Sequence, residues 1–318
     1  MGYGFAGHIG IAKEATWGSG VAATDYVEAL SEDVSLSMER FSHKSIIGTM
    51  AEPDDTAGLR KVEGNIAFTA HPVSIGYFLK GVLQTKSVST VGSSLWLNEF
   101  FTTATGGDFS TDVPLQPYTF EIFRDVTSSH RYTGCVVDAL TLTFEPNNAV
   151  MCEASIIGRG AALIAKTAPV FPSSSSKPFT FDTVSLGIAG AGTVLVETLS
   201  VEINNNLEGI GALNQSTDIA KVRRTNHQMV NLKGTMDFTT VTEYLNFVNQ
   251  TEQRFTVSVT KANSFAMIID LPRVVYTAFP VGIPGKERIT VEFEGKAFYN
   301  AGSGTAIKVS LYTTNSMY

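Results

Sequence analysis

Cysteine, positive charge and long apolar runs are all scarce in this sequence, and each scarcity removes a class of protein. Only two cysteines, Cys135 and Cys152, occur in 318 residues, which excludes a disulfide scaffold. Both lie in alternating apolar runs. We therefore expect two buried free thiols in a reducing compartment, with a cross-strand disulfide as the alternative.

Basic residues are outnumbered by acidic ones. The chain has 23 Lys and Arg against 30 Asp and Glu, so its formal net charge is −7. A protein of this balance is not expected to grip nucleic acid through a basic surface. It could still enclose DNA, because repulsion is useful where DNA must slide.

Targeting and membrane signals are missing as well. No apolar run approaches the roughly 20 residues that a spanning helix needs. The first residues lack the basic and apolar segments of a signal peptide, and Ala6 occupies the hydroxyl position of a myristoylation motif. We expect a soluble protein, made in the cytosol and without a membrane partner.

Motifs that carry chemistry are rare. Gly2–Gly7 satisfies the dinucleotide pattern G-x-G-x-x-G, but no strand precedes it, so a flexible arm is the better interpretation. The five histidines are scattered without metal-binding spacing. Glu52, Asp54 and Asp55 could bind a cation, yet their spacing is not that of a calcium loop and a solvated loop is favoured. We predict no catalytic residues, no metal, no cofactor and no enzyme activity.

A strongly alternating stretch is present from residue 28 to residue 39. Its apolar face carries Leu30, Val34, Leu36 and Met38, and its other face is acidic and rich in hydroxyl groups. This period of two predicts a strand with one dry and one wet side.

The alternating stretch occurs a second time, from residue 197 to residue 208. The polar faces match one for one, with an offset of 169 residues (200 − 31), close to half the chain. The matched polar pairs are Ser31 with Ser200, Asp33 with Glu202, Ser35 with Asn204, Ser37 with Asn206, and Glu39 with Glu208. The sequence therefore indicates an internal duplication.

Each repeat continues in the same order of elements. A long loop (42–59 or 209–227) leads to a strand and then to an apolar stripe at helical spacing. The stripes are Ile75, Phe78, Leu79, Val82 and Leu83 in the first repeat, with Ser74 as N-cap, and Val241, Tyr244, Leu245 and Val248 in the second. Further strands follow, among which Leu140–Phe144 matches Val274–Ala278.

These patterns predict a mainly β protein with two tandem β-sandwich or barrel domains, each with one flanking α-helix. We divide the chain into an N-terminal arm (1–26), a first domain (27–167), a linker and entry segment (168–192), a second domain (193–300) and a C-terminal extension (301–318). An insert at 85–117 has no counterpart in the second domain. Its Trp96, Phe100 and Phe101 form either a stacking platform or, as we favour, a hairpin packed on its own domain or on a neighbour.

Three stretches carry a resemblance to a known family: Gly10–Gly18, Glu28–Ser31, and the strand and helix between Val62 and Leu83. Together with the duplication they resemble the tail tube, or major tail, proteins of long-tailed non-contractile bacteriophages, in the variant with two fused tube domains. The likeness covers nearly the whole chain but rests on pattern, because this family has no invariant motif.

The resemblance implies how the protein works. Strands of neighbouring subunits join into a continuous β-barrel around a channel, and a duplicated chain forms a trimer with pseudo-sixfold symmetry. Rings stack through a long loop and the chain termini, and double-stranded DNA leaves the capsid through the lumen without specific binding. The implied partners are further copies of the chain and the tape measure, tail terminator and baseplate proteins, and the implied location is the virion.

The acidic strand faces supply lumen candidates, because carboxylates repel phosphates. We expect Asp33, Glu39, Glu202 and Glu208 to face the lumen, with Glu63 and Asp237 as weaker candidates. The alternative is that these strands are wet because they face outside solvent.

Ring stacking is expected on the two long loops and the N-terminal arm. The candidates are Glu52, Asp54 and Asp55 in the first loop, matched by charge to Lys221, Arg223 and Arg224 in the second. A phosphate contact by the basic residues is the alternative to this pairing between loops.

Two other functions remain open. One is a different β-rich component of a tail or baseplate ring, or a secretion-type tube. The other is a carbohydrate-binding β-sandwich, which is disfavoured because the duplicated polar faces carry almost no aromatic residues.

Overall fold

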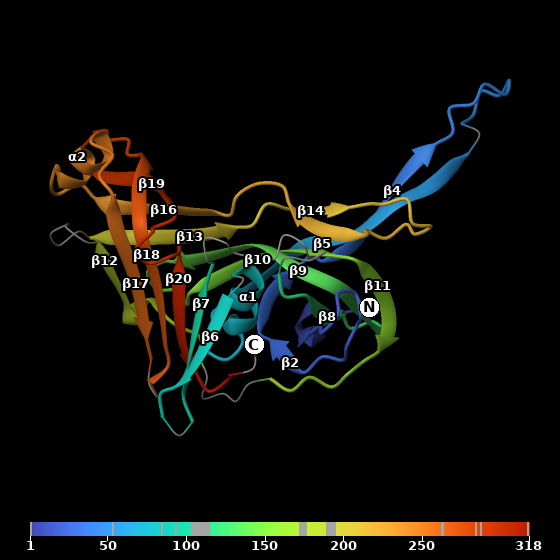
Figure 1. The fold of residues 1–318 in the computed structure, drawn as a ribbon, viewed down its shortest axis with the longest axis horizontal. Coiled ribbons are helices and arrows are strands. Elements are labelled where there is room, and N and C mark those ends of the chain that lie inside the picture. The colour runs from blue at the N-terminus through green and yellow to red at the C-terminus, as the bar shows by residue number, and fades with distance from the viewer. Residues whose placement is uncertain are drawn as a thin grey trace.

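The computed structural model describes the chain except residues 1, 53, 84, 93, 103–114, 172–176, 189–194, 262–263, 284, 287 and 317. Residues 103–114 of the insert at 85–117, and residues 172–176 and 189–192 of the expected linker and entry segment, lie outside the described residues. Strands dominate, so the predicted mainly β fold is confirmed (Figure 1). Neither described α-helix is long and apolar enough to cross a membrane.

The first half of the chain contains eleven of the strands and helix α1 (Ile75–Val82). The strands are β1 (His8–Lys13), β2 (Asp25–Val27), β3 (Ala29–Glu32), β4 (Ser35–Ser42), β5 (Asp55–Thr69), β6 (Thr85–Thr90), β7 (Trp96–Phe101), β8 (Tyr118–Phe123), β9 (Ser128–Phe144), β10 (Met151–Gly158) and β11 (Gly160–Ala165). Short 3₁₀ turns lie at Gly4–Ala6 and Phe181–Thr183.

The second half repeats much of this order around helix α2 (Thr242–Val248). Its strands are β12 (Val184–Ile188), β13 (Val196–Asn204), β14 (Leu207–Ile210), β15 (Lys221–Arg224), β16 (Met229–Asp237), β17 (Gln253–Thr260), β18 (Ala266–Ala278), β19 (Thr290–Ala297) and β20 (Lys308–Thr313).

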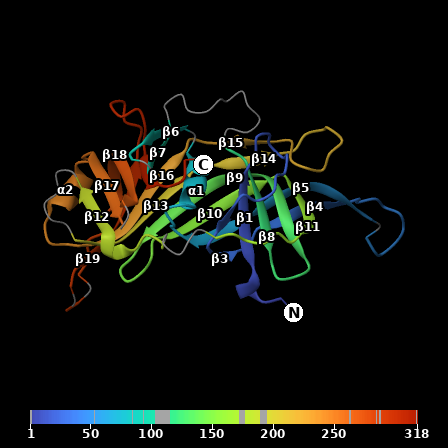
Figure 2. The same cartoon turned by 90° about the horizontal axis from the view of Figure 1, so that it is seen from below.

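One antiparallel sheet crosses from the first half into the second. Along it β3 and β4 pair with β5, followed in order by β10, β9, β13, β16 and β19. We call this series the central sheet. The two halves join where the last residues of β9 pair with β13, with Phe144 opposite Leu199 and Ala139 opposite Asn204. Figures 1 and 2 show these long strands running between the two ends of the molecule.

The two halves share their β-bulges. A bulge between Ala29 and Ser31 in the β3–β5 pairing has its counterpart between Val196 and Thr198 in the β13–β16 pairing. A bulge adds one residue at a defined place in a ladder. Equivalent bulges therefore show which residues of the two repeats correspond, independently of the amino-acid types. The structural offset here is 167 residues (196 − 29), two fewer than the sequence comparison indicated. An error of two residues leaves every side chain on its predicted face.

The later strands are aligned by a second shared bulge. In β9 the extra residue is Asp138, between Val137 and Ala139, and in β18 it is Thr277, between Tyr276 and Ala278. The offset is therefore 139 residues (277 − 138). The predicted match of Leu140–Phe144 with Val274–Ala278 is wrong by five residues. With this offset, β18 ends at Ala278, the counterpart of Ala139, whereas β9 continues from Ala139 to Phe144.

The expected dry face of the first alternating stretch is only partly dry. The stretch is divided into β3 and β4, and of its apolar residues only Val34 is buried, whereas Leu30, Leu36 and Met38 are exposed. Gly64 lies opposite this break with φ +151°, and a Cβ there would come within 2.5 Å of the Val34 backbone. The sheet edge formed by β3 and β4 is therefore built by close backbone contact.

The two helices differ in burial. The α1 stripe is completely buried, with Ser74 at the N-cap position but without a side-chain capping bond. The prediction that the α2 stripe packs on its domain is wrong, because Val241, Tyr244, Leu245 and Val248 are each 40% or more exposed. The inward side of α2 instead carries Glu243, which accepts a hydrogen bond of 2.6 Å from Tyr276.

Segments outside the repeats are integrated into the fold. Residues 8–13, expected in a flexible arm, form the buried strand β1 between β2 and β8. Strand β20, from the expected C-terminal extension, pairs with both β18 and β7. Of the aromatic cluster, Phe100 of β7 is fully buried in its own chain, whereas Trp96 and Phe101 are half-buried. Cys135 and Cys152 are buried free thiols, as expected.

Candidate functional site

The central sheet has one apolar face and one polar face. Along β10, for example, Cys152, Ala154 and Ile156 are buried in the core, whereas Glu153 is exposed. Residues directly opposite each other in a ladder share a face, so the pairings carry this polar face from β5 to β19. It consists of Glu63, Asn65, Thr69, Glu153, Ser155, Thr141, Thr143, Ser200, Glu202, Asn204, Asn231, Lys233, Thr235, Asp237, Glu292, Glu294 and Lys296.

Carboxylates outnumber lysines on this polar face. Lys233 lies 3.4 Å from Glu294, and Lys61, next to the face on β5, lies 2.5 Å from Glu63. Glu202 accepts a hydrogen bond of 3.1 Å from the Asn231 amide. The face is thus hydrated, acidic and without exposed aromatic residues among those that line it.

The structure places the lumen candidates unevenly. Glu63, Glu202 and Asp237 lie on the polar face, and Asp33 lies at its margin, where its carboxylate accepts a hydrogen bond from the backbone N–H of Asn65. Glu39 is exposed on β4, and Glu208 lies off the central sheet, opposite Arg223 in the β14–β15 hairpin. Which of these residues face a lumen stays a prediction.

Three acids of the polar face were missed from the sequence: Glu153, Glu292 and Glu294. The signal was present, because residues 151–158 and 290–297 alternate with a period of two. Their face could not be chosen without knowing which strands pair.

The two long loops form projecting hairpins that touch each other. The β4–β5 hairpin extends away from the body of the molecule beside β14 (Figure 1). Arg60 pairs with the Asp218 carboxylate, and its backbone N–H donates to the carbonyl of Thr217 at 2.8 Å. Near the hairpin tips Ile46, Met50 and Leu213 are fully exposed.

The charged stacking candidates are partly engaged within the chain. Asp55 pairs with Arg40, whose guanidinium lowers the pKa of that carboxyl, whereas Glu52 and Asp54 are exposed. Arg224 donates a hydrogen bond of 2.6 Å to Asn205, and burial lowers the pKa of Arg224. Lys221 and Arg223 are half-buried on β15. The pairing of the acidic loop with the basic loop between copies stays a prediction.

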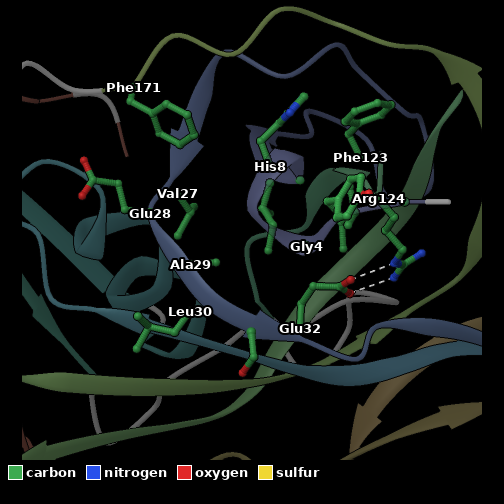
Figure 3. Close-up of a pocket in the computed structure, with 16 residues that line it drawn as sticks. Gly4, His8, Val27, Glu28, Ala29, Leu30, Glu32, Phe123, Arg124 and Phe171 are labelled. Carbon is green, nitrogen blue, oxygen red and sulfur yellow. Dashed lines mark hydrogen bonds and ion pairs between the residues drawn. The ribbon is translucent and has the colours of Figure 1, made fainter. Parts of the chain in front are cut away.

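A cavity of about 760 Å³ lies beside the free edge of β3 (Figure 3). Its wall includes the segment from Val27 to Glu32, together with His8, Phe123 and Phe171. At one side Arg124 donates two hydrogen bonds of 2.7 Å to the Glu32 carboxylate. Burial lowers the pKa of His8. Within the described part of the chain, no three His, Cys, Asp or Glu side chains gather where they could hold a metal ion.

Comparison with known families identifies the class of protein. A family model described as phage tail tube protein matches residues 4–297. The chain belongs to this family. A search of curated proteins found no match. The predicted resemblance is therefore confirmed: the chain is a structural component of a phage tail tube, and membership implies self-assembly and a place in the virion.

Proposed function

We propose that three copies of this chain close into a pseudo-sixfold ring, and that stacked rings form the tail tube of a long-tailed, non-contractile phage. Each chain would contribute two similar sets of strands to one barrel. The observation that carries this proposal is the pairing of β9 with β13, which joins the two repeats edge to edge in a single sheet. A sheet that continues from repeat to repeat can close without leaving an edge exposed.

The polar face of the central sheet is our candidate lumen wall. DNA carries one negative charge per about 1.7 Å of duplex, so a wall rich in carboxylates repels it at short range. Ser, Thr and Asn side chains between the acids offer no aromatic surface on which bases could stack. DNA would therefore move through the lumen on its way from capsid to host without being bound.

The remaining partners follow from this role. The tube would assemble in the host cytoplasm, contact a tape measure protein inside, and end at a tail terminator and a baseplate. A β-rich ring elsewhere in the tail, or a secretion-type tube, is the second candidate. The pair of projecting hairpins favours stacking into a tube over a single ring, because it offers an axial contact surface on every copy.

Electron microscopy of the purified full-length chain tests the proposal. We expect long tubes with a regular axial repeat, threefold rings and six similar wall segments per ring. Single rings that never stack would support the ring alternative. A persistent monomer across concentration and salt would contradict both.

Deleting residues 45–57 should separate ring formation from stacking. These residues form the outer part of the β4–β5 hairpin, and those that the structure describes are all exposed. We expect folded rings that no longer stack, measured by electron microscopy and by sedimentation. Tubes of unaltered length after this deletion would contradict the assignment, and an unchanged circular dichroism spectrum controls for folding.

A further inference from the structure

Inside one chain, the edge of the second repeat at β13 is already paired with a strand of the first repeat. We call this pairing the joint. There β9 continues beyond its bulge, and its residues 139–144 pair with Leu199–Asn204 of β13. Phe144, at the end of this stretch, is buried. It lies with Leu186 and Val257 of the second half around a residual cavity of only about 280 Å³. The first repeat thus donates a strand and an aromatic side chain, and the second repeat accepts them.

The second repeat has a donor segment that remains unpaired. With the bulge-defined offset of 139, residues 278–283 correspond to 139–144 of β9. In the described chain this segment is not a strand beyond Ala278, and Ile283, the counterpart of Phe144, is 81% exposed. Because the segment leaves the sheet, residues Thr290–Phe293 of β19 pair with β16 alone among the described strands.

The first repeat has an acceptor that remains unfilled. With the offset of 167, residues 32–37 correspond to the paired part of β13, and among the described strands β3 and β4 pair only with β5. Ile9 faces Ile122 across β1 and β8, as Leu186 faces Val257 across β12 and β17. The same positions that surround Phe144 in the second repeat therefore line the 760 Å³ cavity in the first (Figure 3).

We propose that this cavity and strand edge receive residues 278–283 of a second copy of the chain. Ile283 of that copy takes the position of Phe144, in a register that sets Ile283 opposite Glu32 and Ala278 opposite Ser37. The inference rests on the proposed self-assembly and assigns its ring contact to particular residues. Since each copy has one donor and one acceptor, the contact is head-to-tail, and it closes when three copies supply six equivalent joints.

The register is compatible with the proline in the donor. The Asp33 N–H donates to Asn65 of β5, so in an extended strand the backbone groups of residues 33 and 35 point toward β5. Pro280 falls opposite Ser35, at a position whose backbone also points away from the joint. The N–H that proline lacks is therefore not one that the joint requires.

In the isolated chain, two side chains occupy the backbone hydrogen-bonding groups of the acceptor edge at Val34. The Val34 N–H donates to the Glu32 carboxylate at 3.1 Å, and Arg124 donates to the Val34 carbonyl at 2.6 Å. These two side chains satisfy the backbone groups that the donor strand would pair with. Their counterparts in the second repeat, Leu199 and Val259, are apolar and cannot make these hydrogen bonds. Only the first repeat, whose edge has no partner strand among the described residues, has such side chains. They block pairing with a wrong strand until the donor strand displaces the Arg124–Glu32 ion pair.

Disulfide trapping in the full-length chain tests the register. The pair Asp33→Cys with Gly282→Cys is directly opposite in the proposed joint, at a non-hydrogen-bonded position where side chains approach closely. On oxidation of the assembled protein we expect covalent multimers up to the closed trimer. We expect a yield at least tenfold lower from the matched pair Ser35→Cys with Gly282→Cys, which is two residues out of register. The native thiols are buried and give a low background.

The outcomes separate this inference from the tube function. Tubes in which the two pairs link equally, or not at all, would overturn the register and leave the tube function intact. In-register links in wild-type-like oligomers that never form tubes would support the joint and contradict the tube function.

A second variant covers the case in which cysteine pairs impair assembly. Ile283→Asp alters a side chain that is exposed in the isolated chain, so thermal unfolding should be unchanged while sedimentation shows a monomer. Leu163→Asp, at an equally apolar residue of β11 that is 67% exposed, is the matched control and should assemble as the wild type does. Normal tubes from Ile283→Asp would overturn the inference.

Discussion

Tubes whose polar-face glutamates are replaced by lysine are expected to bind DNA instead of letting it pass. The variant changes the five glutamates that the pairings place on one wall, Glu63, Glu153, Glu202, Glu292 and Glu294. Each reversal adds two charges, so five reversals move the formal net charge of the chain from −7 to +3. Lysines on a wall facing DNA release counterions when they meet phosphates.

The size of this effect follows from the number of phosphates met at once. A protein that makes about 6–10 phosphate contacts loses roughly 10³–10⁵-fold in affinity between 50 and 200 mM salt. We therefore expect DNA retention by the variant tubes at 50 mM salt, and a loss of at least about 10³-fold in affinity at 200 mM. Fluorescently labelled duplex DNA, retained or released by purified tubes, gives the measurement.

The matched control replaces the same five glutamates by glutamine. It removes the repulsion without adding phosphate ligands, so we expect little retention at any salt concentration. Lysine tubes that bind DNA no better than glutamine tubes would contradict the assignment of this face to a wall that meets DNA. Electron microscopy before the assay checks that both variants still form tubes.

The second large effect, a loss of folding stability, is expected at Asn205, whose side chain contacts both repeats. Asn205 is fully buried at the end of β13, and its amide donates to the Val82 carbonyl at the end of α1, at 2.9 Å. Its carbonyl oxygen accepts from Arg224 at 2.6 Å and from Gln228 at 2.9 Å. One side chain thus satisfies a helix end of the first repeat and a half-buried guanidinium of the second.

Replacing Asn205 by alanine leaves these groups without that partner. A buried polar group that loses its hydrogen bond costs about 1–3 kcal/mol, and a charged one costs more. We expect the free energy of unfolding of the isolated chain to fall by about 3 kcal/mol, and Tm to fall by roughly 5 °C for a chain of this length. Calorimetry and denaturant titration give the two values.

Asn231→Ala is the matched control for the Asn205→Ala variant. Asn231 is the same residue type at the edge of the same joint, but it lies half-exposed on the polar face and donates only to Glu202. Water can replace that partner, so we expect a loss below about 1 kcal/mol. Equal losses for the two variants would contradict the role of Asn205 in joining the repeats.

Much of the architecture was predictable because alternation is a local property. The wet faces of β13 and β16 were assigned correctly although the repeat offset was two residues too long, since a strand returns to the same face after two residues. The two helices were found for a similar reason, from apolar spacing. The burial of the α2 stripe was not predictable, because spacing indicates an apolar side but not what covers it.

Pairing between distant strands accounts for the errors. Glu153, Glu292 and Glu294 alternate as clearly as Glu202, but their place on one wall depends on which strands are neighbours. Residues 8–13 have no local signal that separates a loose arm from a buried strand; the partners β2 and β8 decide it. Within the chain Arg60 and Asp218 make the contact between the two loops, because hairpin geometry brings those positions together, and no local pattern singles them out.

By itself the sequence determined a duplicated, mainly β, acidic chain without a catalytic constellation, and its resemblance to a tail tube family. Those properties depend on composition and on periods of a few residues, which the chain carries locally. Only the tertiary structure decided that β9 of one repeat pairs with β13 of the next, and that, among the described strands, residues 32–37 pair with β5 alone and residues beyond Ala278 leave the sheet. Bulges and ladder registers exist only between strands that have already met, so no local pattern could reveal them.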